Sequence, residues 1–213
     1  KNNVYIALAA ILVYFNCLQN GFVWDDMLLI INNDFSKGFG LIQYVFTKPL
    51  FYLVNPDYQY YRPVQAVSNI IDYKLWGLNP FGFHLTNLLL HIICAALVYN
   101  LLNLLFFSPK TAFFASLFFT VHPINTSTVA YISGRADILL VLFTLLSLIT
   151  FLKSVSFWQY LLSFLFFVLA IFSKETALIF PVLLILTSEI YLSLRAANKN
   201  EVLKKRLYYL FFP

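Results

Sequence analysis

Two adjacent acidic residues, Asp25 and Asp26, directly follow an apolar stretch near the start of the chain, within the run GFVWDD. Neighbouring carboxylates repel each other, and an apolar environment raises a carboxyl pKa. One of the two could therefore act as a general base, or both could help to hold a divalent metal ion. A solvated turn or a helix cap is the structural alternative. The pair is the first candidate for chemistry in this sequence.

The segment that closes the same polar region offers a cation next to aromatic rings, with Arg62 preceded by Tyr60 and Tyr61. Arginine carries a planar fork of five donors that suits a phosphate group. Tyrosines at this distance from an apolar run also fit the aromatic belt of a membrane surface. Both interpretations stay open for this segment.

Further polar residues lie where apolar runs end: His122, Arg135, Asp137, Lys174 and Glu175. The charges could pair with their sequence neighbours, Arg135 with Asp137 and Lys174 with Glu175, as structural ion pairs. Equally, the two cations could bind an anionic ligand.

A polar stripe interrupts the longest apolar run, at His84, Asn87 and His91. The spacing i, i+3, i+7 places the three side chains on one face of a helix. Polar side chains within a span usually face the bundle interior and bond to neighbouring helices. The two imidazole rings would lie about 10 Å apart along the axis, too far to share a metal ion. We therefore predict a structural stripe.

Composition fixes the class of protein that must position these residues. Of 213 residues, 61% are hydrophobic and 11% are charged, less than half the charged fraction of a soluble domain. A membrane span needs about 20 apolar residues. The two cysteines, Cys17 and Cys94, lie in apolar runs without metal-like spacing. A soluble enzyme, a secreted disulfide scaffold and a disordered tail are excluded, and we predict an all-α polytopic membrane protein.

The apolar runs predict a bundle of about six transmembrane helices, at 4–18, 83–107, 111–122, 136–152, 157–172 and 176–194. The third run is short for a crossing, so the third and fourth could form a re-entrant pair. The large first loop, 19–80, contains an amphipathic pattern at 64–76 that predicts a helix on the membrane surface.

Charge patterning orients the predicted bundle. The net charge is +5, but five of the fourteen basic residues lie between Arg195 and Arg206, just after an apolar run. That position is typical of a cytoplasmic flank and not of a nucleic-acid site. Lys110 and Lys153 fall on the same face. The opposite, non-cytoplasmic face receives loop 19–80 and segments 122–137 and 173–175, which hold seven of the nine acidic residues.

Five short motifs follow one another along the chain: FVWDD at 22–26, YRP at 61–63, HxxNxxxH at 84–91, HP and GRAD within 122–137, and SKE at 173–175. This series resembles the membrane half of the transmembrane and tetratricopeptide-repeat-containing O-mannosyltransferases and their bacterial relatives. Those proteins belong to the GT-C glycosyltransferase superfamily. The resemblance covers most of the chain and implies a GT-C-like transmembrane bundle.

The resemblance also implies roles for individual residues. Asp25 is expected to be the catalytic base and Asp26 to support it. The leaving lipid phosphate needs cations, and the residues expected near the donor are Arg62, Arg135, Lys174, Tyr61 and His122. The residues expected to support them are Asp137, Glu175, His84, Asn87 and His91. A divalent metal ion is compatible with the acid pair, but no set of metal ligands and no bound cofactor is predicted.

By this resemblance, the protein transfers a hexose, mannose being the first choice, from a polyprenyl-phosphate donor to a Ser or Thr hydroxyl of a protein. Transfer takes place on the non-cytoplasmic face and inverts the anomeric centre. The expected partners are membrane lipids, the donor, and a protein acceptor or partner membrane subunits. The membrane is the bacterial inner membrane or, in a eukaryote, the endoplasmic reticulum.

The sequence departs from the family in one respect, because residues 1–213 contain no 34-residue helical repeat. We expect a single transmembrane domain that is a piece of a longer protein. A non-catalytic or degenerate GT-C-like subunit of a larger membrane complex is therefore the alternative function. A transporter is a third option, disfavoured because most charges lie near one membrane face.

Overall fold

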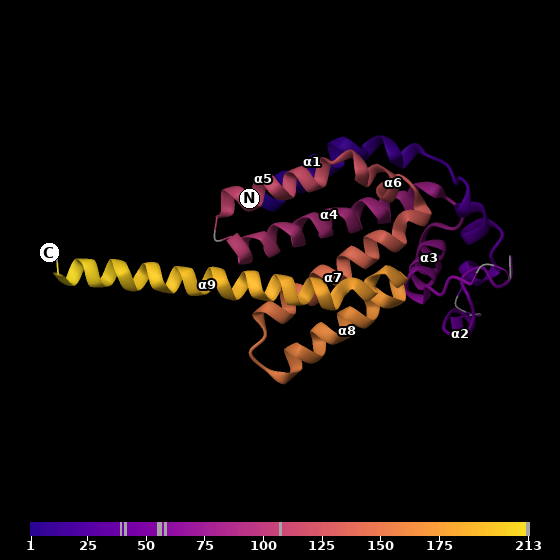
Figure 1. Cartoon of the computed structure of the whole chain (residues 1–213). Coiled ribbons are helices and arrows are strands. Elements are labelled where there is room, and N and C mark those ends of the chain that lie inside the picture. Colours follow the sequence, from indigo (N-terminus) through magenta and orange to yellow (C-terminus); the bar gives the residue numbers. More distant parts are fainter. Residues whose placement is uncertain (39, 41, 55–56, 58, 107, 212–213) are drawn as a thin grey trace.

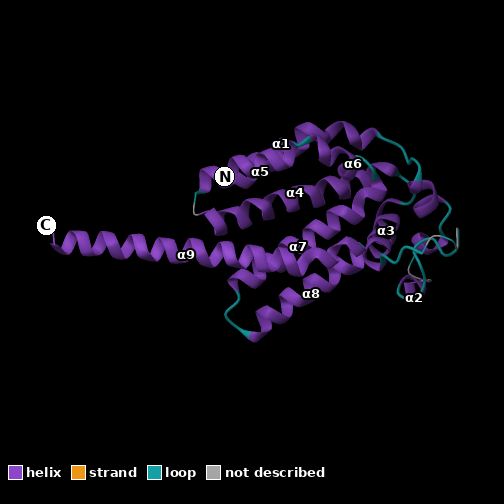
Figure 2. Cartoon of the chain, in the orientation of Figure 1, coloured by secondary structure: helices purple, strands orange, loops and turns teal. Residues whose placement is uncertain are grey.

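The structure is a computed structural model that describes residues 1–38, 40, 42–54, 57, 59–106 and 108–211. Throughout this part of the chain the regular structure is helical, with no strand (Figure 2). The predicted all-α class is confirmed. Of the side chains at 35, 36, 106 and 197–211 nothing is described, so the predicted cytoplasmic basic cluster lies largely outside the described side chains.

Each predicted apolar run becomes a helix: α1 (Asn2–Tyr14), α4 (Pro80–Phe106), α5 (Pro109–Val121), α7 (Arg135–Lys153), α8 (Phe157–Ser173) and α9 (Phe180–Phe211). Within the described residues, four helical segments are long and apolar enough to cross a membrane: Asn2–Gln19, Pro80–Leu105, Ile132–Lys153 and Glu175–Ala196. Helix α8 is a shorter apolar helix. The chain is a polytopic helical membrane protein.

Helix α5 is short because proline ends it. Its 13 residues span about 20 Å, less than the roughly 30 Å of a hydrocarbon core. Pro123 disfavours a helical conformation at the preceding residue, and His122 is accordingly extended, with φ −66° and ψ 131°. The side chain of Asn125 donates to the carbonyl of Phe119 at 2.6 Å, which satisfies an acceptor freed by the break.

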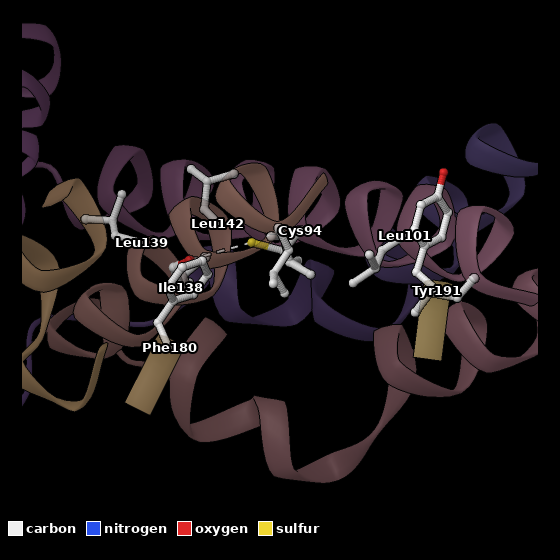
Figure 3. Packing of buried hydrophobic residues seen from close by; sticks show 10 residues of the cluster. Cys94, Leu101, Ile138, Leu139, Leu142, Phe180 and Tyr191 are labelled. Carbon is white, nitrogen blue, oxygen red and sulfur yellow. Dashed lines mark hydrogen bonds between the residues drawn. The ribbon is translucent and has the colours of Figure 1, made fainter. Parts of the chain in front are cut away.

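Helix α4 is the centre of the bundle and packs against α1, α5 and α7. The main apolar core joins α4 to α7 and α9, and Figure 3 shows its residues Cys94, Leu101, Ile138, Leu139, Leu142, Phe180 and Tyr191. The thiol of Cys94 donates to the carbonyl of Ile138 at 3.6 Å. This core fixes the start of α7, where several of the predicted site residues lie.

Helices α7 and α8 form a close antiparallel hairpin joined by two serines. The hydroxyl of Ser147 donates to the carbonyl of Ser163 at 2.8 Å, and the hydroxyl of Ser163 donates to the carbonyl of Ser147 at 2.9 Å. Small hydroxyl residues let two backbones approach closely within a membrane and satisfy each other there. The pair therefore fixes the register of the hairpin at mid-height.

Helix α3 (Pro63–Trp76) lies at one end of the bundle, beside η2 (Met27–Ile31), η3 (Asp34–Lys37) and α2 (Ile42–Val45) of the first loop (Figure 1). It begins one residue before the predicted amphipathic segment. Its buried face is partly polar and includes Gln65, Asn69 and Asp72. Ile71 and Leu75 are exposed on its other side. The polar stripe of the helix therefore faces the protein.

The connections gather at two opposite ends of the bundle (Figure 1). One end holds the N-terminus, the α4–α5 turn and the α7–α8 turn. The other end, called the site end below, holds the first loop, the segment between α5 and α7 with α6 (Thr126–Val129) and η6 (Ile132–Gly134), and the turn η7 (Glu175–Ile179) before α9. The predicted site residues thus come from segments that share one end.

Candidate active site

Asp26 is the anchored member of the acid pair. Its carboxylate is wholly buried, and Oδ1 accepts hydrogen bonds from the backbone N–H of Ser133 at 2.8 Å and from its hydroxyl at 2.6 Å. Oδ2 accepts from the backbone N–H of Val23 at 3.1 Å. Burial raises the pKa of Asp26, and the hydrogen bonds from Ser133 and Val23 oppose part of that rise. The residue ties the first loop to the turn before α7.

Asp25 is the exposed member of the pair. Its backbone N–H donates to the hydroxyl of Tyr131 at 3.2 Å, and its carboxylate also interacts with that hydroxyl. Burial raises the pKa of Tyr131, and the neighbouring charge of Asp25 adds to that rise. The two adjacent acids therefore have different environments: one carboxylate can meet a substrate, and the other holds the turn.

Arg135 is the most deeply buried cation, at the first position of α7, and is 0% exposed. Its Nε donates to Asn87 Oδ1 at 2.8 Å, and its Nη2 donates to the carbonyl of Phe83 at 2.9 Å. Its Nη1 donates to Ser68 Oγ at 3.1 Å and to Asn69 Oδ1 at 3.3 Å. These contacts join α7 to α3 and α4.

The charge of Arg135 is balanced by Asp72 of α3, whose Oδ2 lies 2.6 Å from Nη2. This contact is an ion pair but not a hydrogen bond, because Oδ2 of Asp72 accepts no hydrogen bond of ordinary geometry. The other oxygen, Oδ1, accepts from the hydroxyl of Thr86 at 2.7 Å. The sequence left open whether Arg135 pairs with Asp137 or binds an anionic ligand. In the structure its carboxylate partner is Asp72, and its side chain is fully buried.

Arg62 and Lys174 are also paired with carboxylates distant in sequence. Arg62 donates to both oxygens of Glu175, from Nε at 3.2 Å and from Nη2 at 2.7 Å. Lys174 Nζ donates to Asp137 Oδ1 at 2.6 Å. Lys174 does not pair with Glu175, which the sequence had left open, because each pairs with a residue of another segment. The two partly buried cations, Arg62 and Lys174, thus lie in separate ion pairs near the turn before α9.

Tyr61 and His122 make local contacts. The hydroxyl of Tyr61 donates to the carbonyl of Phe46 at 2.9 Å, and its ring packs edge-on against Phe172. His122 Nδ1 accepts from the backbone N–H of Ile124 at 3.2 Å, and so caps the short helix after α5. Tyr61 therefore lies beside the end of α8, and His122 stabilises the break after α5.

The stripe on α4 faces the bundle interior, and His84, Asn87 and His91 are all buried. His91 contacts the carbonyl of Thr120 on α5 through Nε2 at 3.0 Å. Asn87 Nδ2 donates to the carbonyl of Tyr131 at 3.0 Å. Both ring nitrogens of His84 lack a hydrogen-bond partner of ordinary geometry, although the ring interacts electrostatically with Asp26.

These contacts form a continuous connection from the buried cation to the surface acid. Arg135 bonds to Asn87, Asn87 bonds to the backbone of Tyr131, and the Tyr131 hydroxyl accepts from the backbone of Asp25. Arg135 can therefore position the acid turn without contacting a ligand. Asn87 is the residue that links Arg135 to Tyr131.

A metal ion is not supported by the surroundings of the acid pair. Both oxygens of Asp26 already accept hydrogen bonds from protein groups. Among the residues that the structure describes, no three His, Cys, Asp or Glu side chains are grouped closely enough to bind a metal ion. The residues present do not fit a resident divalent cation.

Three residues of the site were missed as site residues from sequence: Ser133, Tyr131 and Asp72. Ser133 lies two positions before Arg135, inside a segment already singled out as polar. Asp72 follows Asn69 and Gln65 at i+3 and i+7 on α3, so the helical period of the polar residues was a signal. Nothing in the sequence around Tyr131 indicates its contact with Asp25.

Chemically, the segments at the site end supply an exposed carboxylate, Asp25, on a turn held by hydrogen bonds, and two partly exposed cations, Arg62 and Lys174. A carboxylate can take a proton from a hydroxyl, and cations can stabilise an anionic leaving group. This combination suits group transfer to a hydroxyl with an anionic leaving group.

Comparison with known proteins gives a family for most of the chain. Residues 66–212 match the family described as dolichyl-phosphate-mannose-protein mannosyltransferase. No solved structure matches the chain significantly. The matched residues include Arg135 and Lys174 but begin after the acid pair.

Curated relatives agree with this match. The chain is 36% identical over 154 residues to human protein O-mannosyl-transferase TMTC1, covering 70% of this chain and 18% of that protein. It is 35% identical over 156 residues to Xenopus laevis protein O-mannosyl-transferase tmtc2, covering 72% and 19%. To human protein O-mannosyl-transferase TMTC4 it is 30% identical over 166 residues, covering 70% and 22%. The chain thus spans about a fifth of these relatives.

Proposed function

Because this chain belongs to the dolichyl-phosphate-mannose-protein mannosyltransferase family, we propose that it supplies the catalytic acid turn of a membrane protein O-mannosyltransferase. The donor is mannose on a polyprenyl phosphate, and the acceptor is a Ser or Thr hydroxyl of a protein. The observation that carries the proposal is the exposed carboxylate of Asp25 on a turn anchored by the buried Asp26.

In this mechanism Asp25 removes the proton from the acceptor hydroxyl. The hydroxyl oxygen forms a bond to the anomeric carbon of mannose, and the bond from that carbon to the phosphate oxygen breaks. The electron pair leaves with the lipid phosphate, and attack from the opposite side inverts the anomeric centre. Asp26 is a positioning residue, since its oxygens bind Val23 and Ser133 of the protein itself.

The leaving phosphate gains negative charge, and cations at the same face stabilise it. Of the three cations expected near the donor, Arg62 and Lys174 are the more accessible, with side chains 16% and 24% exposed. Both are held by carboxylates, so the phosphate competes with Glu175 and Asp137 for them. Arg135 acts instead through Asn87 and Tyr131 on the position of Asp25.

The positive-inside rule orients the site end toward the non-cytoplasmic side. In a eukaryote this is the lumen of the endoplasmic reticulum, and in a bacterium the periplasm. A lipid-linked sugar is then presented at the membrane surface next to Arg62 and Lys174. Membrane lipids, the donor and a protein acceptor are the partners of this proposal.

The decisive experiment is Asp25→Asn in the native membrane-embedded protein. Loss of a general base costs a factor of about 10²–10⁴ in rate, so mannose transfer from a polyprenyl-phosphate donor to a Ser/Thr peptide should fall by that factor. Asp34→Asn is the matched control, because Asp34 is an exposed acid of the same loop that pairs locally with Lys37. Transfer at the parent rate by Asp25→Asn would show that another group is the base.

One observation favours a second candidate, a non-catalytic subunit of a larger membrane complex. Arg62, Arg135 and Lys174 each already have a carboxylate partner, as expected of charges that only hold helices together. If the parent protein transfers no mannose from any polyprenyl-phosphate donor, this second function is the better one.

A further inference from the structure

Trp24, directly before the acid pair, has an unusual backbone conformation. Its φ is +46°, and among the described residues it alone is a non-glycine residue with a positive φ. This left-handed region is unfavourable for a bulky side chain, whereas glycine adopts it freely. Such strain persists only where surrounding structure enforces it, and it collects at functional sites.

Trp24 is also highly exposed, with 83% of the residue accessible to solvent. The indole is not randomly oriented, however. Its ring meets the ring of Tyr131 at 6.1 Å between centroids and 73° between planes, an edge contact. Tyr131 is the residue whose hydroxyl accepts from the backbone of Asp25. One tyrosine therefore fixes both the indole and the turn that carries the exposed acid.

A role as a simple membrane anchor does not explain this arrangement. Tryptophan is common at membrane interfaces, but an anchor needs only an apolar ring at the right depth, and an ordinary backbone provides that. Trp158 is such a residue, 74% exposed near the beginning of α8 in helical conformation, at the end of the bundle opposite the site. At Trp24 the backbone is instead strained, and the ring contacts Tyr131, the residue that also bonds to the backbone of Asp25.

We propose that the indole of Trp24 is a stacking platform for the mannose ring of the donor. A hexose presents a face of C–H groups with partial positive charge, and the face of an aromatic ring is negative. A sugar stacked on Trp24 would hold its anomeric carbon beside the Asp25 carboxylate. This inference rests on the proposed function and names a specificity residue for it.

The test measures binding of the donor, not sugar transfer. It uses the whole native protein, extracted from the membrane into detergent micelles. Two ligands are titrated, polyprenyl-phosphate mannose and the same polyprenyl phosphate without sugar. Trp24→Gly removes the ring and suits the left-handed backbone, and Trp24→Phe keeps a smaller ring. Trp158→Ala is the matched control for loss of an exposed tryptophan.

We expect Trp24→Gly to weaken binding of the mannosyl lipid about tenfold, with Trp24→Phe between it and the parent. Binding of the sugar-free lipid should stay within about twofold in all variants, and Tm should shift by no more than about 4 °C. Equal weakening for both ligands would show that Trp24 contacts the lipid or membrane and would overturn the inference. So would unchanged binding of the mannosyl lipid.

Failure here is separate from failure of the proposed function. If Trp24→Gly binds the donor normally while transfer still depends on Asp25, only the stacking role is lost. If the parent protein binds no mannosyl lipid at all, both proposals fall.

Discussion

Arg135 and Asp72 form an ion pair with 2.6 Å between Nη2 and Oδ2, and their side chains are 0% and 3% exposed. The pair joins the start of α7 to α3, which lie 63 positions apart in the chain. A buried ion pair of this kind adds little stability relative to a well-packed apolar pair. Removing only one of the two side chains, however, leaves an uncompensated charge inside the protein.

We therefore expect Arg135→Ala to destabilise the protein by about 3–5 kcal/mol, measured by denaturant unfolding in detergent micelles. Arg195→Ala is the control, because Arg195 is an exposed arginine stacked on Tyr191, and should cost less than about 1 kcal/mol. Similar stability of the two variants would mean that the buried pair is not required for folding.

Gly134 packs so closely against the backbone of α6 that a side chain does not fit. A Cβ at this position would come within 2.8 Å of the carbonyl oxygen of Thr128 and 2.9 Å of that of Ser127. Backbone atoms cannot move aside as a flexible side chain can, so Gly134→Ala should cost about 1–3 kcal/mol. A Cβ at Gly21 would meet nothing within 4 Å, so Gly21→Ala should unfold like the parent protein. An equally stable Gly134→Ala would contradict the close approach.

The buried acid predicts a pH dependence of stability. Because burial raises the pKa of Asp26, the folded protein binds this proton more tightly than the unfolded chain does. The stabilisation is complete below about pH 4, the ordinary range of Asp, and is lost as the pH rises through the raised pKa of Asp26. Asp26→Asn stays neutral and should abolish that loss in Tm values measured from about pH 4 to about pH 8.

Ser133→Ala provides a second arm of this experiment. It removes the hydroxyl that donates to Asp26 Oδ1 at 2.6 Å and that favours the carboxylate form. The pH range over which stability is lost should therefore move upward. Ser193→Ala, which removes only a local helix hydrogen bond, should leave the range in place. A downward shift in Ser133→Ala would contradict the assignment.

Glu175 is predicted to compete with the donor phosphate. Its carboxylate accepts hydrogen bonds from Nε and Nη2 of Arg62, yet its side chain is 55% exposed. An exposed ion pair is weak, so a phosphate could replace Glu175 as the partner of Arg62. Glu175→Gln should tighten binding of a sugar-free polyprenyl phosphate by up to about fivefold. Glu189→Gln, which removes the same charge from an exposed position on α9, should not. Weaker binding in Glu175→Gln would mean that Glu175 orients Arg62 for the ligand.

Much of the fold could be predicted from hydropathy, because each helix of the bundle corresponds to one apolar run. Proline also marks the beginnings of α4 and α5. The end of α5 at Val121 also follows from local chemistry, since Pro123 acts on its own neighbour. The stripe on α4 was predictable too, because its 3.6-residue period places three polar side chains on one face.

The site could not be predicted to the same extent, because partners distant in sequence determine it. Adjacent acids look equivalent in sequence, and the donors that Asp26 finds inside the protein come largely from Ser133, 107 positions away. The partners in the ion pairs were unpredictable for the same reason. Sequence proximity favours Lys174 with Glu175, but the packing of α8 against α7 brings Asp137 to Lys174. The polar face of α3 is buried because Arg135 supplies a counter-charge there.

The two serines that join α7 and α8 have a mechanical consequence. Reciprocal hydrogen bonds at mid-height and the Lys174–Asp137 pair at the site end hold α7 and α8 together at two levels, which opposes sliding of one helix along the other. Under the proposed function, we therefore expect the movement that admits an acceptor to come from the first loop. The Arg62–Glu175 ion pair is one of the contacts that hold this loop to the hairpin, so a ligand that displaced Glu175 would also loosen the loop.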